Sequence, residues 1–597
     1  MRSERPNLNL WPIGNCQVSA LIDDAGRFVW ACVPRVDGEP LFSALLDGEE
    51  PKAGFWDIAL EGCVETSISY LRNTPILLTR HRDEAGNAIE VVDFCPDYPQ
   101  DAGLYRPMAF ARIVRPVHGS PRIRVRLRPA GGWGRPADIV RGSGNYLRFG
   151  TGDAELRLTT SAPIGLVQEE RAFRLERPTH FFLGPDEPFL QEIGSALDAM
   201  LQKTMQSWQS WVRGLAIPLE WQSAVIRAAI TLKLCQHAET GAIVAALTTS
   251  IPEHAGSERN WDYRFCWIRD AYYTVQALNR LGALDILEGY LAFLRNIVDA
   301  ARGGHIQPLY GVLGEAELEE RIVPELAGYR GIGPVRIGNQ AARQIQHDAY
   351  GQIVLSSAQA FFDERLFRPA GEEDFLALER VGQRAWENYD QPDSGLWELR
   401  NSQTVHTYSS VMCWAACDRL ANVAAALGKP GRARLWQQRA DRIRAHVEQA
   451  TWRPQSRIFS ASFEGDQIDA SVLQLLDLRF IRPDDERFLA TIDTMEKELR
   501  RGSHMLRYAS EDDFGLPQTA FNVCTFWLIE ALHLTGRSEE ARGLFESILA
   551  QRTPSGLLSE DIDPYTGELW GNFPQTYSLV GIINCAMLLS RSWSTIR

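Results

Sequence analysis

The chain has 597 residues, with 62 Lys and Arg against 76 Asp and Glu, which gives a formal net charge of −14. Its 45% hydrophobic and 23% charged residues are ordinary for a globular protein, so disorder, collagen and coiled coil are excluded as the dominant class. An acidic chain has no general electrostatic attraction to nucleic-acid phosphates or anionic lipids, so neither nucleic acid nor a membrane is an expected partner.

The N-terminal residues lead into polar sequence without the apolar stretch of a signal peptide, and no run of about 18 apolar residues predicts a membrane span. The 10 Cys are scattered without a CxxC pair, and the 11 His form no HExxH motif. We therefore expect a cytoplasmic protein with reduced thiols, no metal site and no organic cofactor.

Residues 1–190 are predicted to form an antiparallel β-sandwich. Short alternating segments such as 27–33, 88–94 and 122–128 are separated by Gly, Pro, Asp and Asn, as turns require. Many short strands between turns are typical of this fold. In 122–128 every second residue is Arg, which we interpret as the solvated face of one strand rather than an anion site.

After Pro188 the hydrophobic period becomes helical. We expect a linker helix over 191–216 and an all-α domain over 217–597. The expected helices cover approximately 218–240, 267–281, 283–301, 341–365, 372–389, 405–427, 431–451, 468–476, 484–500, 517–536, 538–550 and 575–592. Six hairpins closed in a ring would gather their loops at one end as a cleft, although an open solenoid would give the same helix count.

The connection 303–340 is too polar and too often interrupted by Gly and Pro to be one helix. A connection this long in a compact domain is usually functional. Its acidic run, Glu315–Glu320, is predicted to be the solvated face of a helix rather than a cation site.

Aromatic and charged residues crowd the segment 259–271, where a predicted helix begins. Arg269 and Asp270 offer the donors and acceptors needed to bind vicinal sugar hydroxyls, and Tyr263 and Trp267 stand beside them. An ion pair next to an aromatic core anchor explains this segment equally well on its own.

A second candidate is Glu398, which follows Trp397. Apolar surroundings favour the protonated form of a carboxyl, as a general acid requires, whereas pairing with Arg400 would oppose it. Taken alone, this segment is better explained by a surface glutamate in a loop.

The third candidate segment, 556–575, places Glu560, Asp561 and Asp563 in a loop rich in turns. One of these carboxylates could act as a general base near water. We assign Asp561 and Asp563 first to Asx turns and helix capping.

Together these segments resemble glycoside hydrolase family 15, which contains glucoamylases, glucodextranases and bacterial trehalases. The motifs are RNWDYRFCWIRDA (259–271), GLWELR (395–400), HTYSSVMCWAACDRL (406–420), EDDFGLPQTAFNVCTFWLIEAL (511–532) and LLSEDIDPYTGELWGNFPQTYSLVGIIN (557–584). IGNCQVSALIDDAGRFVWACVPR (13–35) is similar to the start of the family's β-sandwich, so the resemblance covers nearly the whole chain. It implies that residues 217–597 form an (α/α)6-barrel catalytic domain, an all-α toroid, and it implies exo-cleavage of α-glucosides with inversion.

The resemblance also implies roles for individual residues. Glu398 matches the general acid and Glu560 the general base, while Arg269 and Asp270 match the pair that holds the non-reducing glucose. The remaining candidates for substrate binding are Tyr263 and Trp267 in the first subsite, Trp397, Tyr310, Gly311, Arg336 and Gln344 at the mouth, and Trp570 after the base. Leu399 stands where some members carry a second Glu, which bears on the choice of the second sugar.

We expect release of β-D-glucose from a small carbohydrate, and we favour trehalose because no signal peptide points to an extracellular polymer. A glucoamylase or isomaltose-type activity on short α-1,4 or α-1,6 gluco-oligosaccharides is the alternative. A phosphorylase would lack Glu560, and a non-catalytic sugar-binding toroid would have no reason to hold both carboxylates. The sequence leaves the oligomeric state open.

Overall fold

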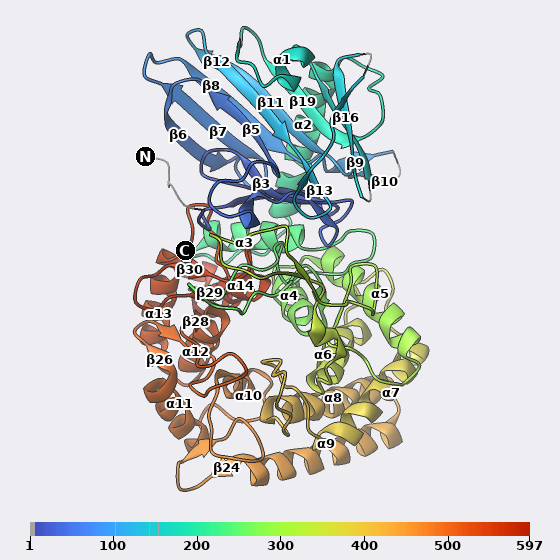
Figure 1. Ribbon diagram of the computed structural model, residues 1–597. Helices are drawn as coiled ribbons and strands as arrows, with labels where there is room; N and C mark the ends of the chain where they lie inside the picture. Colours follow the sequence, from blue (N-terminus) through green and yellow to red (C-terminus); the bar gives the residue numbers. More distant parts are fainter. Residues whose placement is uncertain (1–5, 102, 143, 153, 597) are drawn as a thin grey trace.

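A computed structural model describes residues 6–101, 103–142, 144–152 and 154–596. Figure 1 shows an antiparallel β region at one end of the molecule and a ring of helices at the other, as expected from the change in periodicity after Pro188. The predicted combination of β-sandwich and helical toroid is confirmed.

The β region consists of two antiparallel sheets. The first has the order β1-β2-β3-β5-β12-β18, with β4 also pairing with β3. Its strands are β1 Trp11–Gly14, β2 Ser19–Ile22, β3 Phe28–Val33, β4 Glu39–Phe42, β5 Phe55–Leu60, β12 Arg122–Arg128 and β18 Phe173–Arg174. On β12 the apolar residues are buried, and the alternating arginines pair with the carboxylates of Asp57, Glu61 and Glu170. The interpretation of this arginine stripe as a solvated strand face is thus confirmed.

The second sheet has the order β15-β16-β17-β19-β11-β8-β7-β6. Its strands are β6 Cys63–Tyr70, β7 Leu77–Asp83, β8 Ala88–Phe94, β11 Phe110–His118, β15 Val140–Arg141, β16 Tyr146–Thr151, β17 Ala154–Thr160 and β19 Thr179–Pro185. Two hairpins, β9 Tyr98–Gln100 with β10 Gly103–Tyr105 and β13 Ala130–Gly131 with β14 Arg135–Pro136, and the short helix α1 Ile164–Gln168 complete the region. Inward residues of both sheets, among them Phe28, Trp56 and Phe181, form one buried core, which is the packing of a sandwich.

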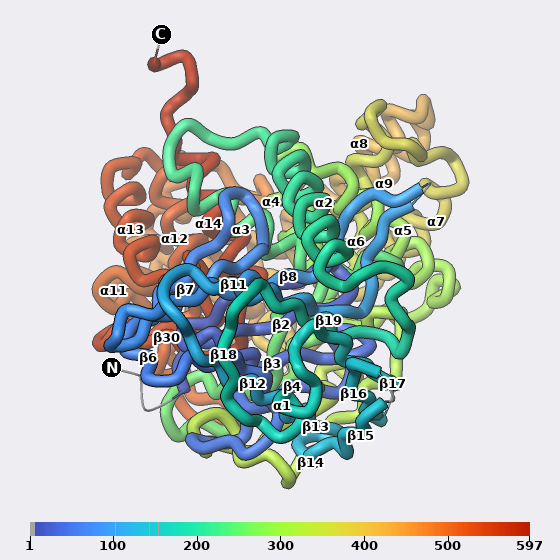
Figure 2. Tube along the Cα trace, turned by 90° about the horizontal axis from the view of Figure 1, so that it is seen from above, coloured from blue at the N-terminus to red at the C-terminus, as the bar shows by residue number. Residues whose placement is uncertain are grey.

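Helix α2, Ile193–Arg213, joins the two regions. Its N-terminus is capped by Glu192, whose carboxylate accepts hydrogen bonds from the amides of Gly194 and Ser195. Leu197 and Leu201 pack on the outer face of the eight-stranded sheet, over which α2 runs in Figure 2. Trp208, near the end of the helix, packs against the first helix of the ring and so fastens the sandwich to the toroid.

In residues 217–596, all of which the structure describes, twelve helices follow. They are α3 Gln222–Leu234, α4 Ile268–Arg280, α5 Leu284–Ala301, α6 Asp348–Ala358, α7 Glu372–Asn388, α8 Thr407–Ala426, α9 Pro430–Thr451, α10 Gln474–Asp477, α11 Glu486–Leu499, α12 Asn522–Leu534, α13 Ser538–Ala550 and α14 Thr576–Leu589. The helix expected over 341–365 is shorter, because 3-10 turns at Gln340–Arg343 and Gln359–Phe361 flank α6.

The helices form a closed ring rather than an open solenoid. The inner layer passes from α4 to α6, α8, α10 with its preceding 3-10 turn, α12 and α14, and α14 packs back against α4. The outer helices α5, α7 and α13 each pack against two consecutive inner helices, α9 packs on α8, α3 packs on α14, and α11 packs on the 3-10 turn before α10. Inner helices are buried on nearly all faces, which is why the sequences of α8, α12 and α14 show little amphipathic contrast.

The long connection 303–340 contains short strands instead of a helix. β21 Leu309–Tyr310 pairs with β20 Cys266–Trp267, and β22 Arg321–Val323 forms a hairpin with β23 Val335–Ile337. The prediction of a helix over Glu315–Glu320 is wrong, because this run is extended coil whose end carboxylates bond to Arg35 and Arg400. Ion pairs with residues of distant loops hold this segment, in place of the hydrogen bonds within a helix that its composition predicted.

All ten cysteines lie in the described residues and are free thiols. No helix in the described part of the chain is long and apolar enough to cross a bilayer.

Candidate active site

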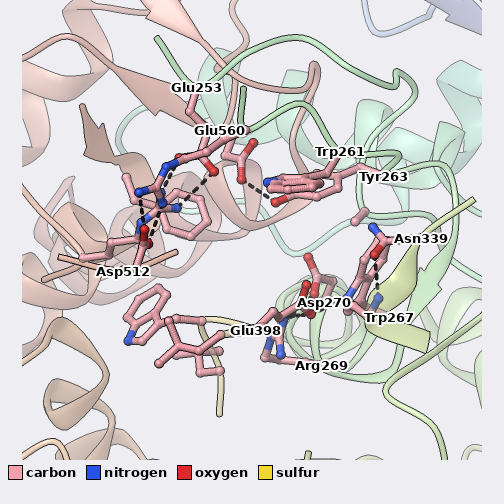
Figure 3. A pocket seen from close by; sticks show the side chains of 18 of the residues that line it. Glu253, Trp261, Tyr263, Trp267, Arg269, Asp270, Asn339, Glu398, Asp512 and Glu560 are labelled. Carbon is pink, nitrogen blue, oxygen red and sulfur yellow. Dashed lines mark hydrogen bonds and ion pairs between the residues drawn. The ribbon is translucent and has the colours of Figure 1, made fainter. Parts of the chain in front are cut away.

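One cavity opens at the end of the ring where the loops leading into the inner helices meet. Its walls come from the segments before α4, α6, α8, α12 and α14. It is lined by Ala245, Glu253, Arg259, Trp261, Tyr263, Trp267, Arg269, Asp270, Asn339, Ala341, Gln344, Leu396, Trp397, Glu398, Leu399, Arg400, Arg507, Tyr508, Asp512, Asp513, Phe514, Phe521, Glu560, Gln575 and Tyr577. Figure 3 shows Glu398 and Glu560 on facing sides of this cavity.

The start of α4 brings Arg269 and Asp270 to the cavity wall. Trp267 is the extended residue before the helix, so the next residues form its first turn, where a negative charge suits the helix dipole. Asp270 Oδ2 lies 3.8 Å from Arg269 Nε. Burial raises the pKa of Asp270 to about 7, since the charged form loses its hydration.

Three hydrogen-bond donors converge on one oxygen of Glu398. Trp267 Nε1 is 2.7 Å, Arg269 Nη2 3.1 Å and Gln346 Nε2 3.3 Å from Glu398 Oε1. Arg269 is fixed in turn by bonds from its Nε to the Tyr577 hydroxyl and from its Nη1 to Gln346. The arrangement leaves Oε2 as the oxygen of Glu398 that can exchange a proton with a ligand.

The loop that carries Glu398 is tightly constrained. Glu398 has φ 59°, in the left-handed region that residues with a Cβ seldom adopt. Gly395 supplies a second left-handed turn, and a Cβ there would meet the His406 ring at 2.7 Å. The buried carboxylate of Asp393 holds the loop by accepting bonds from His347 N and the Ser409 hydroxyl. Backbone strain at a cavity carboxylate is typical of functional sites.

Glu560 is buried on the opposite wall, with 1% of its surface exposed. The Tyr263 hydroxyl donates to Glu560 Oε1 at 2.6 Å, and the amide of Asn572 approaches Oε2 at 3.4 Å. Gly571 has φ 73°, and a Cβ there would lie 2.6 Å from the Cβ of Glu560. Only glycine therefore lets the chain pass behind this carboxylate.

Three buried carboxyls meet beside this wall: Glu253, Glu560 and Asp561. Burial, and after it the negative charge of Glu253, raises the pKa of Glu560 to about 8, and the pKa of Asp561 is raised well above its ordinary range by the same causes. Arg507 is the cation that pairs with Glu253. The charge of Glu560 is one cause of the raised pKa of Asp561, so ionisation of one of these two neighbours opposes ionisation of the other.

The same three carboxyls are the one group in the described part of the chain whose ligand atoms, all within 4.8 Å of one another, could hold a metal ion. Their oxygens already accept bonds from Arg507, Tyr263 and Thr519. This donor set is typical of a shared-proton network with an arginine counter-charge.

Asp561 and Asp563 differ from each other in role. Asp563 accepts from the amides of Tyr565 and Thr566, so its assignment to an Asx turn is confirmed. The same assignment for Asp561 is wrong, because it belongs to β29 (Asp561–Ile562), and its buried carboxylate bonds to the Thr519 hydroxyl. Pairing of β29 with β28 (Ala520–Phe521) turns this side chain into the interior.

Of the other predicted residues, Gln344 and Trp397 line the cavity, and Gln344 Nε2 bonds to the carbonyl of Glu398 at 3.0 Å. Four others lie outside the lining. Tyr310 and Gly311 belong to the β21 segment, where the Tyr310 hydroxyl accepts from Gln307 N. The Arg336 guanidinium lies over the Trp261 ring, 4.9 Å from its centroid, and Trp570 packs against Tyr329 and Arg330.

Several lining residues were not predicted. Glu253 and Arg507 stand in segments without a recognisable motif, and their partnership across 254 residues leaves no pattern in the sequence. Five others lie inside the motifs quoted above, and membership of those motifs was the signal that could have identified them. They are Asp512, Asp513, Phe514, Gln575 and Tyr577.

The comparisons with known proteins agree with this geometry. The profile of "Glycosyl hydrolases family 15" matches residues 221–587. Proteins named trehalase from Thermoplasma volcanium and Mycolicibacterium smegmatis are 30% and 32% identical, each over 97% of this chain, and over 93% and 90% of their own lengths. The crystal structure of a bacterial glucoamylase complexed with acarbose superposes with a TM-score of 0.69 at 13% identity over 97% of this chain and 93% of its own, which shows a shared fold.

Proposed function

Because the chain belongs to glycoside hydrolase family 15, we propose that it hydrolyses trehalose, with inversion at the anomeric carbon of the glucose that is attacked. The observation that carries the proposal is the placement of Glu398 and Glu560 on facing walls of one cavity, each with its own set of donors. The full-length relatives named trehalase support the choice of substrate.

Glu398 acts as the general acid. Its Oε2 delivers a proton to the glycosidic oxygen while Trp267 and Arg269 hold Oε1. The positive charge of Arg269 is offset by Asp270 and Asp348, each with an oxygen 3.8 Å from the guanidinium.

Glu560 acts as the general base in its ionised form. It removes a proton from a water molecule that attacks the anomeric carbon from the face opposite to the leaving sugar. Burial and the charge of Glu560 raise the pKa of Tyr263 well above its ordinary value, so the phenol stays a donor to the carboxylate. Room for that water requires the two carboxyls to be about 6.5–9.5 Å apart, against about 5–5.5 Å in a retaining enzyme.

Arg269 and Asp270 fix the glucose whose bond is broken. A guanidinium has five N–H groups, of which three are engaged by Tyr577, Gln346 and Glu398. The remaining N–H groups and the carboxylate of Asp270 are available for sugar hydroxyls.

The test is to identify the sugars released from trehalose at the first moments of reaction. Inversion gives β-glucose from the attacked unit and α-glucose from the leaving unit in equal amounts, whereas retention gives α-glucose alone. Proton NMR before mutarotation separates the two results, and α-glucose alone rejects the inverting mechanism. The ranking of kcat/KM for trehalose, maltose, isomaltose and maltotriose then identifies the preferred substrate.

A further inference from the structure

Three loops meet at the mouth of the cavity, and Arg400 joins them. Its Nη2 is 2.8 Å from Glu320 Oε2, and its Nη1 is 3.2 Å from Glu320 Oε1. The pairing is bidentate and ties the loop after Glu398 to the residue that precedes the β22–β23 hairpin.

The third loop is attached through the backbone of the same segment. The amides of Arg400 and Asn401 donate to Asp513 Oδ2 at 2.7 and 3.1 Å. The loop of Asp513 is anchored in turn by Arg259, whose guanidinium makes two bonds of 2.7 and 2.6 Å to Asp512. All three loops are thus fixed relative to one another by charged contacts at one edge of the cavity.

Aromatic rings lie beneath these contacts. The Arg400 guanidinium carbon stands 4.2 Å from the centroid of Trp261, and Phe514 packs edge-on against the same indole at 5.3 Å. Trp261, Phe514, Arg400 and Asp513 all line the cavity. This edge therefore combines an apolar face with hydrogen-bonding groups, as a sugar-binding surface does.

A short loop joins this edge to the proposed acid. Arg400 is two residues after Glu398, and both side chains line the cavity together with Trp261. The edge therefore adjoins the carboxyl that would protonate the leaving sugar. The Arg400 and Glu320 side chains are only 22% and 16% exposed, so the bridge is not a loose surface pair.

Resting on the proposed function, we infer that the Arg400–Glu320 bridge is a specificity-determining clasp that limits the leaving-group site to one glucose unit. It fixes the wall formed by Trp261, Phe514 and Asp513 against that single sugar. On this inference a third sugar unit would have to displace the clasp.

The experiment measures kcat/KM for trehalose, maltose and maltotriose in the wild type, Arg400→Ala and Glu320→Gln. Loss of the clasp is expected to lower kcat/KM for trehalose about tenfold or more and to raise that for maltotriose relative to it, a change of order 10–100 in their ratio. Glu320→Gln keeps the side-chain size and is expected to move the ratio in the same direction by a smaller factor.

The matched control is Arg135→Ala. Arg135 forms a 3.0 Å ion pair with Glu325 of the same 303–340 connection but lies outside the cavity. Its loss is expected to leave all three kcat/KM values unchanged.

The outcomes separate the clasp from the proposed function. If the wild type releases no glucose from any of the three sugars, the proposed function fails and the clasp with it. If the wild type is active but accepts maltotriose as well as trehalose, or if Glu320→Gln and Arg400→Ala change all substrates by one factor, the clasp is rejected while the hydrolase assignment stands.

Discussion

The phenolic hydroxyl of Tyr263 donates a 2.6 Å hydrogen bond to Oε1 of Glu560, across 297 residues of sequence. A donor to a carboxylate stabilises its ionised form, and ionised Glu560 is the proposed base. Tyr263→Phe is therefore expected to lower kcat/KM by about 10- to 100-fold and to move the acidic limb of its pH profile to higher pH. Tyr565→Phe, at an exposed tyrosine, is the control. If the acidic limb of the kcat/KM profile does not shift in Tyr263→Phe, Tyr263 does not influence the ionisation of Glu560.

Glu253 has the opposite influence on Glu560. The pKa of Glu560 is about 8, raised by burial first and by the charge of Glu253 second. Because the base must be ionised, Glu560 is expected to set the acidic limb of the kcat/KM profile, and its raised pKa moves that limb to higher pH. Glu253→Gln removes a neighbouring negative charge, so ionisation becomes easier and the acidic limb moves to lower pH. Glu568→Gln, at a partly exposed glutamate paired with Arg330, provides the comparison. If the acidic limb of the Glu253→Gln profile moves to higher pH, Glu253 does not raise the pKa of Glu560 through its charge.

The roles proposed for Glu398 and Glu560 can be distinguished by changing the leaving group of the substrate. Glu398→Gln and Glu560→Gln are each expected to reduce trehalose hydrolysis by about 10³-fold or more, since each removes a proton-transfer step. With α-glucosyl fluoride, whose leaving group departs without protonation, Glu398→Gln is expected to recover much of its rate and Glu560→Gln is not. Near-normal turnover of trehalose by either variant would reject the role proposed for the residue that it replaces.

Gly571 holds Glu560 in place by having no side chain. In Gly571→Ala a Cβ would stand 2.6 Å from the Cβ of Glu560 and 2.7 Å from its Oε2, so the carboxylate has to move. We expect kcat to fall at least about tenfold, because small misplacements of a catalytic group are costly. Gly536→Ala has the same backbone strain at φ 92° with nothing within 4 Å of the new Cβ. It is expected to lose about 1 kcal/mol of stability with unchanged kcat. Equal activity of the two variants would reject the steric argument.

The general architecture was predictable from the sequence because period-two and helical patterns dominate their respective halves. Strand β12 and helices such as α5 and α7 follow directly from alternation and from an apolar stripe. Periodicity alone could not predict closure of the ring, which the family resemblance implied, because closure depends on the contact of α14 with α4, elements at opposite ends of the helical region.

Candidate site residues could be recognised in the sequence where aromatic and charged residues lie close together, as in 259–271. Glu253 gave no such signal, because its significance comes from Arg507 and Glu560, which are remote in sequence. The incorrect prediction of a helix over Glu315–Glu320 has the same cause. Its composition suits a helix, but Glu320 contributes more by pairing with Arg400 on another loop.

The closed ring has a consequence for the order in which the protein becomes active. Arg269 bonds to Tyr577, and Tyr263 to Glu560, so the earliest hairpin of the toroid is completed by the latest. A nascent chain still lacking residues 560–577 has Glu398, the proposed acid, but neither Glu560, the proposed base, nor the tyrosine that fixes Arg269. Partly synthesised chains are therefore expected to be inactive, and proteolytic removal of α14 alone is expected to abolish activity.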